Sequence, residues 1–209
     1  MTIAVIADIV GSRALADRTA AQAAIDDAIL RVERDLPLAT RPLIPTVGDE
    51  LQGTYATLTD AMAGLLLVRL ALPDGVDCRY GLGIGATAEV PSRAGALPEG
   101  PAWWAAREAI DTVHALQSRT VPGARTWVSA AEGVDEASVA LSNAYLLARD
   151  EIVSGMSART RRLAYGRIQG RTQVDLARDE GISQSAASQA LASAGVGALV
   201  EGFRLLRGE

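Results

Sequence analysis

The chain alternates short apolar runs, typical of β-strands, with longer segments in which apolar residues recur every three or four positions. The first run, Ile3–Val10, is almost uninterruptedly aliphatic, as expected for a strand covered on both faces. Two further runs, Leu43–Val47 and Leu51–Tyr55, flank Gly48-Asp49 and predict a hairpin with these two residues at its tip.

Helical spacing marks the segments between and after these runs, and prolines near positions 37, 73 and 101 favour helix boundaries there. The predicted helices cover about Thr19–Leu36, Leu58–Leu72, a segment from Pro101, and about Asp135–Ser154. Further strands are expected around Arg79 and over Arg125–Val128, with a loop over Pro91–Gly100. The resulting order β-α-β-β-α-β-α-β is that of a palm or ferredoxin-like domain.

The C-terminal region has the pattern of short helices joined by a tight turn. One helix is expected to end over Leu163–Gly170, a second to run from Thr172 to Arg178, and a third to open at Ser183 after a turn at Gly181. The predicted fold class is α+β. A palm or ferredoxin-like βαββαβ domain (residues 1–132) is followed by a connecting helix (133–156) and an all-α domain (157–209).

Composition narrows the range of functions. The chain has 209 residues, 49% of them hydrophobic, which is enough for one mid-sized domain and a small one. No apolar run approaches a membrane span and no charged-then-apolar segment opens the chain, so we expect a soluble, cytoplasmic protein with no membrane partner. Cys78 and His114 are single residues of their types, which excludes a disulfide framework and zinc sites built on several such ligands.

Charge is distributed unevenly along the chain. Residues 155–209 carry eight arginines and five acids, a balance of +3, whereas residues 1–154 carry twelve arginines and twenty acids, a balance of −8. Such a difference suggests a different partner for each half. The acidic half fits a cation-assisted nucleotide site, and the mildly basic tail fits a polyanion.

Two aspartates stand where plain core packing does not explain them. Asp8 lies at the C-terminal edge of the first strand, and Asp49 lies at the hairpin tip. A buried carboxylate is costly unless it is paired with a cation or with several donors. If the hairpin lies beside the first strand, the two carboxylates converge, and Mg²⁺ suits the site between them. The alternative is that each aspartate caps a turn or the following helix.

Four short motifs resemble those of nucleotidyl cyclases. Ala7–Arg13 resembles the first metal-binding segment of the class III family, and Gly48-Asp49 is similar to the second, on that family's hairpin. Gly48-Asp49-Glu50 also resembles the diguanylate cyclase signature, Arg79–Gly85 a cyclase strand, and Gly100–Arg107 the opening of a cyclase helix. The resemblance implies Mg²⁺ or Mn²⁺ with a purine nucleotide, the metal being held by Asp8, Ile9 and Asp49. The nucleotide contacts that it implies are Gly11, Ser12, Arg13, Gly48 and Arg107.

Two positions depart from the cyclase pattern. Trp103 stands four residues before Arg107, where the cyclases have an Asn that orients the ribose, and Pro45 stands where adenylate cyclases have a Lys that reads adenine. Arg107 can still neutralise phosphate charge, or it can form a helix-surface salt bridge with Glu108 or Asp111. Trp103 and its neighbour at position 104 can stack on a nucleobase or belong to the core. The whole pattern, with Gly-Asp-Glu-apolar-Gln and a Gly-Pro before an Ala-Arg-Glu-Ala-Ile segment, is similar to the SatD family of bacterial proteins.

The tail resembles the helix-turn-helix of sigma factors and related regulators, with Ala177 at the helix crossing and Gly181-Ile182-Ser183 at the turn. In such motifs the second helix enters the major groove of double-stranded DNA, and its first residues meet base edges. The resemblance implies base contacts from Ser183, Gln184, Ser185, Ser188 and Gln189. It implies phosphate contacts from Arg171, Thr172 and Gln173, a track that Arg159, Arg161, Arg162 and Arg167 can extend. The alternative is a motif kept for packing or dimerisation, because the reading helix has no Arg or Lys.

These observations are compatible with three functions. The first is a nucleotide-responsive, DNA-binding transcriptional regulator, acting as a homodimer, whose degenerate cyclase-like domain binds a purine nucleotide with Mg²⁺. The second is an active nucleotidyl cyclase or nucleotidyl transferase with an accessory helix-turn-helix. The third is a non-catalytic interaction scaffold. Retention of Asp8 and Asp49 disfavours the third function, and the missing Asn disfavours the second.

Overall fold

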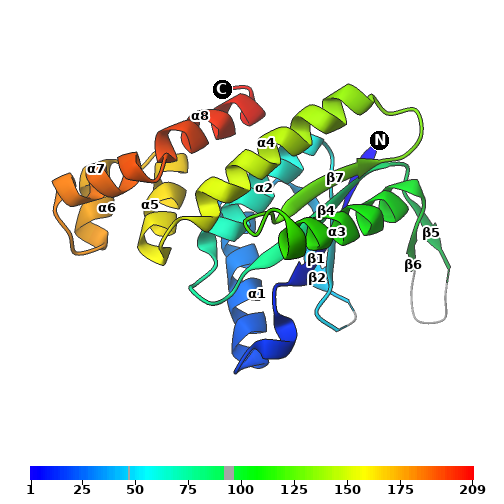
Figure 1. Cartoon of the computed structure of the whole chain (residues 1–209), viewed down its shortest axis with the longest axis horizontal. Helices are drawn as coiled ribbons and strands as arrows, with labels where there is room; N and C mark the ends of the chain where they lie inside the picture. The colour runs from blue at the N-terminus through cyan, green and yellow to red at the C-terminus, as the bar shows by residue number, and fades with distance from the viewer. Residues whose placement is uncertain (47, 92–96) are drawn as a thin grey trace.

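A five-stranded sheet forms the centre of the fold, in a computed structural model that describes residues 1–46, 48–91 and 97–209. Its strands are β1 (Thr2–Ile9), β2 (Ala39–Pro45), β3 (Leu51–Tyr55), β4 (Cys78–Gly85) and β7 (Thr126–Ala130). Their order in the sheet is β2-β3-β1-β4-β7 (Figure 1). β1 is antiparallel to both β3 and β4, whereas β7 joins the sheet parallel to β4.

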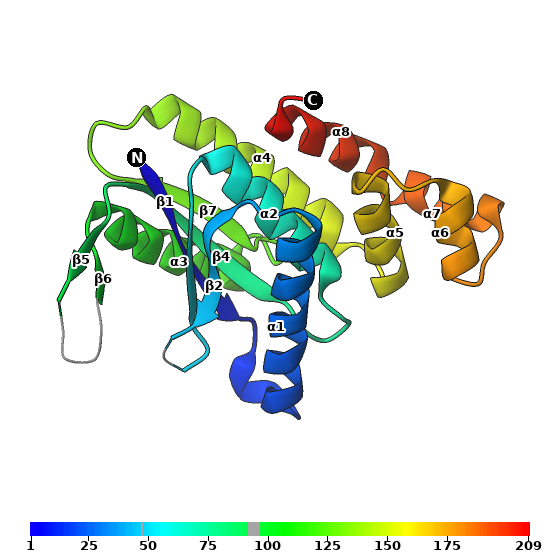
Figure 2. The same ribbon diagram turned by 180° about the vertical axis from the view of Figure 1, so that it is seen from behind.

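Helices cover both faces of this sheet (Figures 1 and 2). On one face lie α1 (Arg18–Asp35) and α2 (Leu58–Ala71), and on the other lies α3 (Pro101–Arg119). Alternate residues of β1 serve the two sides, because Val5 packs with the first pair and Ile6 with α3. The expected βαββαβ order is confirmed, with α3 and β7 added after β4.

Glycines in β4 let α3 lie directly on the sheet. A Cβ atom at Gly83 would lie 1.9 Å from the carbonyl oxygen of Ala102, and one at Gly81 would lie 2.4 Å from that of Ala106. Any side chain at these positions would therefore push the helix away from the strand. Packing alone accounts for the alternate glycines that follow Arg79 in the sequence.

Two short strands flank and enter the segment predicted to be a loop, Pro91–Gly100. β5 (Ala88–Val90) ends just before this segment, and β6 (Leu97–Glu99) lies within it. The two strands pair antiparallel as a second sheet, so the loop prediction is wrong for β6. Leu97–Glu99 is too short for a period-two pattern, and its central proline is tolerated because the ribbon has only two strands. The predicted strand end at Val47 lies outside the described residues, and β2 ends at Pro45.

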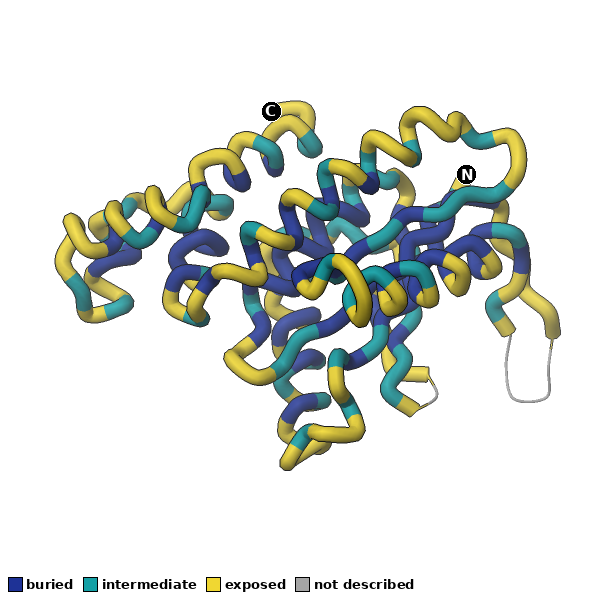
Figure 3. The backbone as a smooth tube through the Cα atoms, in the orientation of Figure 1, coloured by how far each residue is buried: buried dark blue, intermediate teal, exposed yellow. Residues whose placement is uncertain are grey.

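A series of helices follows the sheet and packs back onto it. They are α4 (Glu136–Ser154), α5 (Ala158–Ile168), α6 (Gln173–Asp179), α7 (Gln184–Ser193) and α8 (Val196–Arg207). Both α5 and α8 contact α2, which is therefore buried along Ala61–Leu70 between the sheet and the tail (Figure 3). The buried core runs without a break from the sheet into the C-terminal helices. Of the helices described, none has the length and apolar character needed to cross a membrane.

A buried ion-pair network ties α4 to α2 and to the start of β7. Asp150 of α4 is 0% exposed, and its carboxylate accepts hydrogen bonds from Arg69 at 3.1 Å and from Arg149 at 2.8 Å. The backbone N–H of Arg125 donates to the same carboxylate at 2.8 Å. These donors satisfy a charge that would otherwise be costly to bury.

The single cysteine and the single histidine lie outside this network. Cys78 opens β4 opposite Ile9 of β1, and its burial raises the pKa of its thiol. His114 lies exposed on α3.

Candidate functional site

The turn after β1 carries the first aspartate motif to the start of α1. Gly11 adopts a left-handed backbone (φ +66°), and a single 3₁₀ turn, η1 (Ser12–Ala14), follows it. A residue with a side chain is strained at such a φ, which explains the glycine. Asp17 then caps α1, because its carboxylate accepts a hydrogen bond from the N–H of Ala20 at 2.9 Å. The turn therefore presents Arg13 to solvent and leaves Ser12 half-buried beside the strand end.

The two aspartate-containing segments meet in space. The Ser12 hydroxyl lies near enough to the carboxylate of Asp49 to lower its pKa, and Nη2 of Arg18 donates a hydrogen bond to the carbonyl oxygen of Gly48 at 2.8 Å. Gly48 has a left-handed backbone (φ +71°), as a tight hairpin tip requires. The hairpin tip therefore lies against the turn that follows β1.

Asp49 is held in its ionised form by these neighbours. The hydrogen bond from Ser12 lowers the pKa of Asp49, while partial burial of the carboxyl opposes that shift. The positive charges of Arg18 and Arg13 lower the pKa further. The result is a partly exposed carboxylate with two arginines beside it, which is an arrangement suited to a charged ligand.

Asp8 points to the α3 face of the sheet and is paired with an arginine. Its carboxylate accepts hydrogen bonds from Nε of Arg79 at 2.8 Å and from Nη2 at 3.0 Å, a bidentate pair. Arg79 is the register partner of Asp8 across β1 and β4, and its Nη1 donates to Gln117 of α3 at 2.9 Å. The guanidinium group of Arg79 therefore provides the positive charge that a buried carboxylate at position 8 was expected to need.

Arg107 is bound to the hairpin rather than to its own helix. Its Nη2 lies 2.7 Å from a carboxylate oxygen of Glu50, whose other oxygen accepts a hydrogen bond from Gln52 at 2.9 Å. Of the two alternatives considered for Arg107, the salt bridge with Glu108 or Asp111 is not among the ion pairs of the described residues. The reason is that Arg107 faces the sheet end, where the hairpin supplies a better-placed carboxylate than the helix does.

Sequence reasoning missed three residues of this site, namely Arg18, Glu50 and Arg79. The usable signal was the period of two along each strand, since residues two apart share a face of the sheet. Ile6 pairs with Gln52 in the β1–β3 register, so the same face next carries Asp8 on one strand and Glu50 on the other. No such strand pattern identifies Arg18, because its hydrogen bond to Gly48 joins the start of α1 to the hairpin tip, and neither position lies in a strand.

Oxygen ligands for a cation are present at the end of β1, although they do not form a dense acidic cluster. Within residues 1–46, 48–91 and 97–209, no three His, Cys, Asp or Glu side chains gather closely enough to hold a metal ion. Arg79 occupies two lone pairs of Asp8, which leaves further lone pairs on that carboxylate as well as those of Asp49. Ile9 has a hydrocarbon side chain without ligand atoms, so it can contribute only its backbone carbonyl.

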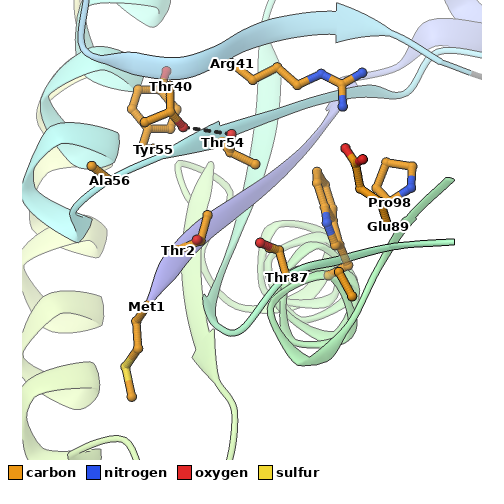
Figure 4. A pocket seen from close by; sticks show the side chains of 12 residues that line it. Met1, Thr2, Thr40, Arg41, Thr54, Tyr55, Ala56, Thr87, Glu89 and Pro98 are labelled. Carbon is orange, nitrogen blue, oxygen red and sulfur yellow. Dashed lines mark hydrogen bonds between the residues drawn. The ribbon is translucent and has the colours of Figure 1, made fainter. Parts of the chain in front are cut away.

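The two tryptophans at the start of α3 lie away from Asp49. Trp103 is 8% exposed and lines a cavity of about 760 Å³ between the β2–β3 hairpin and the β5–β6 ribbon (Figure 4). Thr2 lines the same cavity from the start of β1, whereas Asp8 lies near the far end of that strand. Trp104 is exposed, and its indole N–H donates to Glu99 at 2.7 Å. Of the two roles considered for Trp103, burial in the domain is the one that this position favours.

In the tail, α6 and α7 are joined by a turn at Gly181, whose backbone is left-handed (φ +63°). The hydroxyl oxygens of Thr172 and Ser183 accept hydrogen bonds from backbone N–H groups at 3.1 and 3.2 Å and so cap these two helices. Gln173 is half-buried, and the side chains at the start of α7 with predicted base contacts are all exposed: Ser183, Gln184, Ser185, Ser188 and Gln189. Helix capping alone explains the residue types at positions 172 and 183.

The arginines of the tail are bonded within the protein. Arg162 forms a bidentate pair with Glu180 at 2.7 and 2.6 Å, and this hydrogen bonding lowers the pKa of the Glu180 carboxyl. The other pairs are Arg159 with Glu180, Arg161 with Asp74, Arg171 with Asp179, Arg178 with Asp175, Arg204 with Glu201 and Arg207 with Asp60. Arg167 donates instead to the backbone carbonyl of Arg171. Phosphate contacts from these side chains would have to replace existing partners.

The fold and its polar groups define an α+β protein in which a palm-like sheet domain carries paired carboxylates and arginines at one end and continues into a helical tail. The chain belongs to the SatD family, whose model matches residues 2–201. Among curated proteins, none matches the chain.

Solved structures with a partly similar fold are adenylyl cyclases. Two structures of a bacterial light-regulated adenylyl cyclase are each 12% identical over 57% of this chain, with TM-scores of 0.41 and 0.42. The match spans 40% of the first of these chains and 71% of the second. The adenylyl cyclase CyaB from P. aeruginosa is 12% identical over 56% of this chain and 81% of its own, with a TM-score of 0.38. Likeness this weak carries no conclusion about what the present chain binds.

Proposed function

We propose that the protein binds the phosphate chain of a purine nucleotide with Mg²⁺ or Mn²⁺ at the end of β1, and that its reaction is that of a nucleotidyl cyclase or nucleotidyl transferase. The observation that carries the proposal is the contact between the two aspartate segments, Ser12 with Asp49 and Arg18 with Gly48. One small surface thereby combines an ionised carboxylate, a glycine turn and exposed arginines. Phosphate groups are commonly recognised by guanidinium groups and by the N–H groups of such turns.

The donor set fits a hard divalent cation. The carboxylates of Asp8 and Asp49 and the carbonyl of Ile9 would hold it, because Mg²⁺ takes oxygen ligands and completes its shell with water and phosphate. A bound cation of this kind withdraws charge from the phosphate oxygens and from an attacking hydroxyl. Asp8 is 26% exposed on its side chain, so a ligand can approach it while Arg79 keeps its place.

The chain's own residues would orient the nucleotide. Arg13 and Arg18 lie beside Asp49 and would neutralise phosphate oxygens, assisted by the N–H groups of the Gly11–Ser12 turn. Arg107 is half exposed on its side chain and would exchange Glu50 for a phosphate oxygen. In a cyclase reaction a ribose hydroxyl attacks the α-phosphorus and pyrophosphate leaves.

Turnover is expected to be slow. Trp103 and Pro45 replace groups that the cyclases use to orient the ribose and to read adenine. Loss of one preorganised donor typically costs about a hundredfold to a thousandfold in rate. We therefore expect product over hours at high protein concentration rather than rapid catalysis.

The test is chromatography of ATP and GTP after long incubation with the full-length protein, first with Mg²⁺ and then with Mn²⁺. The matched variants are Asp49→Ala at the proposed site and Glu201→Gln, which removes an exposed acid on α8. A cyclic or linked nucleotide made by the wild type and by Glu201→Gln, but not by Asp49→Ala, is the expected result. Intact nucleotides with saturable, metal-dependent binding would restrict the function to binding, and absence of binding would overturn it.

A second candidate function is the DNA-binding regulator, acting as a homodimer with residues 157–209 as the helix-turn-helix domain. Its specific support is the exposure of the polar side chains at the start of α7. Dimerisation would supply the second half-site contact that a single motif lacks. Gln184→Ala should weaken binding to a selected DNA site under this function, and unchanged affinity would remove the base-reading assignment.

A further inference from the structure

A groove lies along the free edge of the sheet, between β7 and the first half of α4. β7 is the last strand in the order β2-β3-β1-β4-β7, and α4 runs beside its outer side (Figures 1 and 2). The cavity between them has a volume of about 660 Å³ and is also lined by Glu108 of α3. This groove, which we call the β7 groove, is therefore at the opposite edge of the sheet from the β2–β3 hairpin.

One backbone position of β7 is open toward the β7 groove. The side-chain amide of Asn143 accepts a hydrogen bond from the N–H of Val128 at 2.8 Å and donates to its carbonyl oxygen at 2.9 Å, as a neighbouring strand would do. The N–H of Ala131 donates to Ile84 of β4 at 2.8 Å, so Ala130 directs its own N–H and C=O to the free side, as Val128 does. Ala130 is partly exposed, lines the groove, and bonds no other described residue through these groups.

The wall that α4 contributes to the β7 groove is apolar. Most of the first half of this helix is exposed (Figure 3). The lining residues share one helical face: Val139, Ala140, Asn143, Ala144 and Leu147. Trp127 of β7 lines the same groove and is only partly buried. Apolar side chains of a partner would therefore be removed from water between the helix and the strand.

The charged residues of the β7 groove all have the same sign. Glu108, Glu132 and Glu136 line it, and no arginine is among the described residues that do so. The three carboxylates belong to none of the ion pairs between described residues, and Arg107, the neighbour of Glu108 in sequence, pairs with Glu50 instead. An apolar groove with three such carboxylates favours a partner that carries positive charge.

We propose that the β7 groove binds a short extended segment of a partner protein, in which apolar residues are flanked by lysine or arginine. Its backbone adds to the free edge of β7 and exchanges hydrogen bonds with Ala130, as peptides do at other open sheet edges. Its apolar side chains pack against the α4 wall, and its basic side chains pair with Glu132 and Glu136. A helix in the same place would cover the N–H and C=O of Ala130 without bonding them, so the extended form is favoured.

Asn143 limits the length of the added strand. Its amide already takes the place of a strand residue opposite Val128, so pairing ends there. The partner segment therefore contributes one pairing position at Ala130 and gains the rest of its affinity from side chains. Because this edge is far from β2 in the sheet order, the segment and a nucleotide beside Asp49 can be bound at once.

The probe is a phage-displayed library of random heptapeptides, selected on the full-length protein and counter-selected on Ala140→Arg. This variant fills the β7 groove with a cation one helical turn from Glu136. The matched control is Ala137→Arg, which changes an exposed residue of α4 outside the groove. A synthetic copy of the most enriched peptide should bind the wild type and the control equally, and Ala140→Arg about tenfold more weakly or worse. Ala144→Arg is the second variant if Ala140→Arg does not fold.

Two further measurements test the chemistry of the complex. The double variant Glu132→Gln, Glu136→Gln should bind the peptide several-fold more weakly at low salt and lose most of the salt dependence. Methylation of single backbone amides in the peptide should abolish binding at the position that pairs with Ala130 and be tolerated at its neighbours. Hydrogen exchange of the Ala130 amide should slow in the complex.

The proposal is overturned if no basic, apolar peptide is enriched against Ala140→Arg, or if amide methylation has no effect at any position. Octylamine is the probe for a cationic amphiphile, and its displacement of the peptide together with tolerance of methylation would assign the groove to an alkyl chain. Asp49→Ala should bind the peptide as the wild type does, so this proposal and the nucleotide proposal fail separately.

Discussion

The arginines at the end of β1 and those of the C-terminal helices differ in what they contact. In the tail, seven of the eight arginines form ion pairs with carboxylates, and Arg167 donates to a carbonyl. Beside Asp49, Arg18 donates to the carbonyl of Gly48, and within the described part of the chain neither Arg18 nor Arg13 forms an ion pair. The acidic half of the chain thus holds the more available cations, and the basic half holds the more committed ones.

This difference shows why segment charge is a poor guide to ligands. Counted along the sequence, the tail is positive, yet Asp60 and Asp74 of the sheet domain reach across to pair with two of its arginines. These pairs help to dock the tail onto α2 and leave less charge for a polyanion. Whether an arginine is available to a ligand depends on whether a carboxylate already pairs with it, and those pairs are set by the tertiary structure.

The largest expected effect is on stability. Arg79→Ala should lower the free energy of unfolding by about 3 kcal/mol. The Asp8 carboxylate would then lose both of its hydrogen-bond donors, and Arg79 itself is largely buried. Denaturant unfolding measures the change. If Asp8→Asn combined with Arg79→Gln restores most of the stability, the pair is structural; a loss under 1 kcal/mol for Arg79→Ala would contradict the buried pair.

The second test compares one arginine from each region directly. Arg18→Gln should weaken binding of a nucleoside triphosphate about tenfold, because one charge-assisted contact to phosphate is lost. Arg178→Gln, an exposed arginine of the tail, should leave that affinity unchanged. Fluorescence titration with a labelled nucleotide distinguishes them, and equal effects from both variants would remove the difference between the regions.

A third test releases arginines in the tail. Glu180→Gln removes the partner of both Arg159 and Arg162, so binding to double-stranded DNA should strengthen several-fold. The slope of log affinity against log salt should steepen by about one to two units, since each new phosphate contact adds roughly 0.9. Anisotropy titrations at several salt concentrations measure both quantities. An unchanged slope would mean that these side chains do not reach DNA even when freed.

The smallest effect concerns the pKa of Asp49. Its depressed pKa means that the Ser12 hydrogen bond contributes stability above the ordinary pKa of an aspartate, near 4, and that this stability is lost as pH falls through the lower folded-state value. Ser12→Ala should therefore cost about 0.5 kcal/mol at pH 7 and almost nothing at the acid end. Carboxyl chemical shifts recorded against pH should show the Asp49 pKa rising toward its ordinary value in the variant; no rise would exclude the bond.

Most of the fold was predictable because it depends on local patterns. The aliphatic run of β1, the Gly48-Asp49 hairpin tip and the helix boundaries at prolines all appear in the structure to within a few residues. The helix that the tail buries, α2, was also readable as a helix, but its burial on every side depends on α5 and α8, far along the chain.

The site was less predictable, because its contacts join residues distant in sequence. Asp8 and Asp49 were identified from their positions at a strand end and a hairpin tip. Arg79 as the partner of Asp8, and Glu50 as the partner of Arg107, follow from strand register and from the closeness of α3 to the sheet. The metal and nucleotide roles of these residues stay predictions until binding is measured.

Cys78 carries the single thiol of the sequence, so its reactivity can report local opening of the sheet where β1 pairs with β4. The thiol is buried at the strand end opposite Ile9, so a labelling reagent reaches it only when β1 and β4 transiently separate there. With no other thiol to compete, the modification rate divided by that of a model thiol gives the equilibrium constant for this separation. If nucleotide or phosphate slows the labelling, its binding stabilises these strand ends against opening. No engineered probe is needed to detect this.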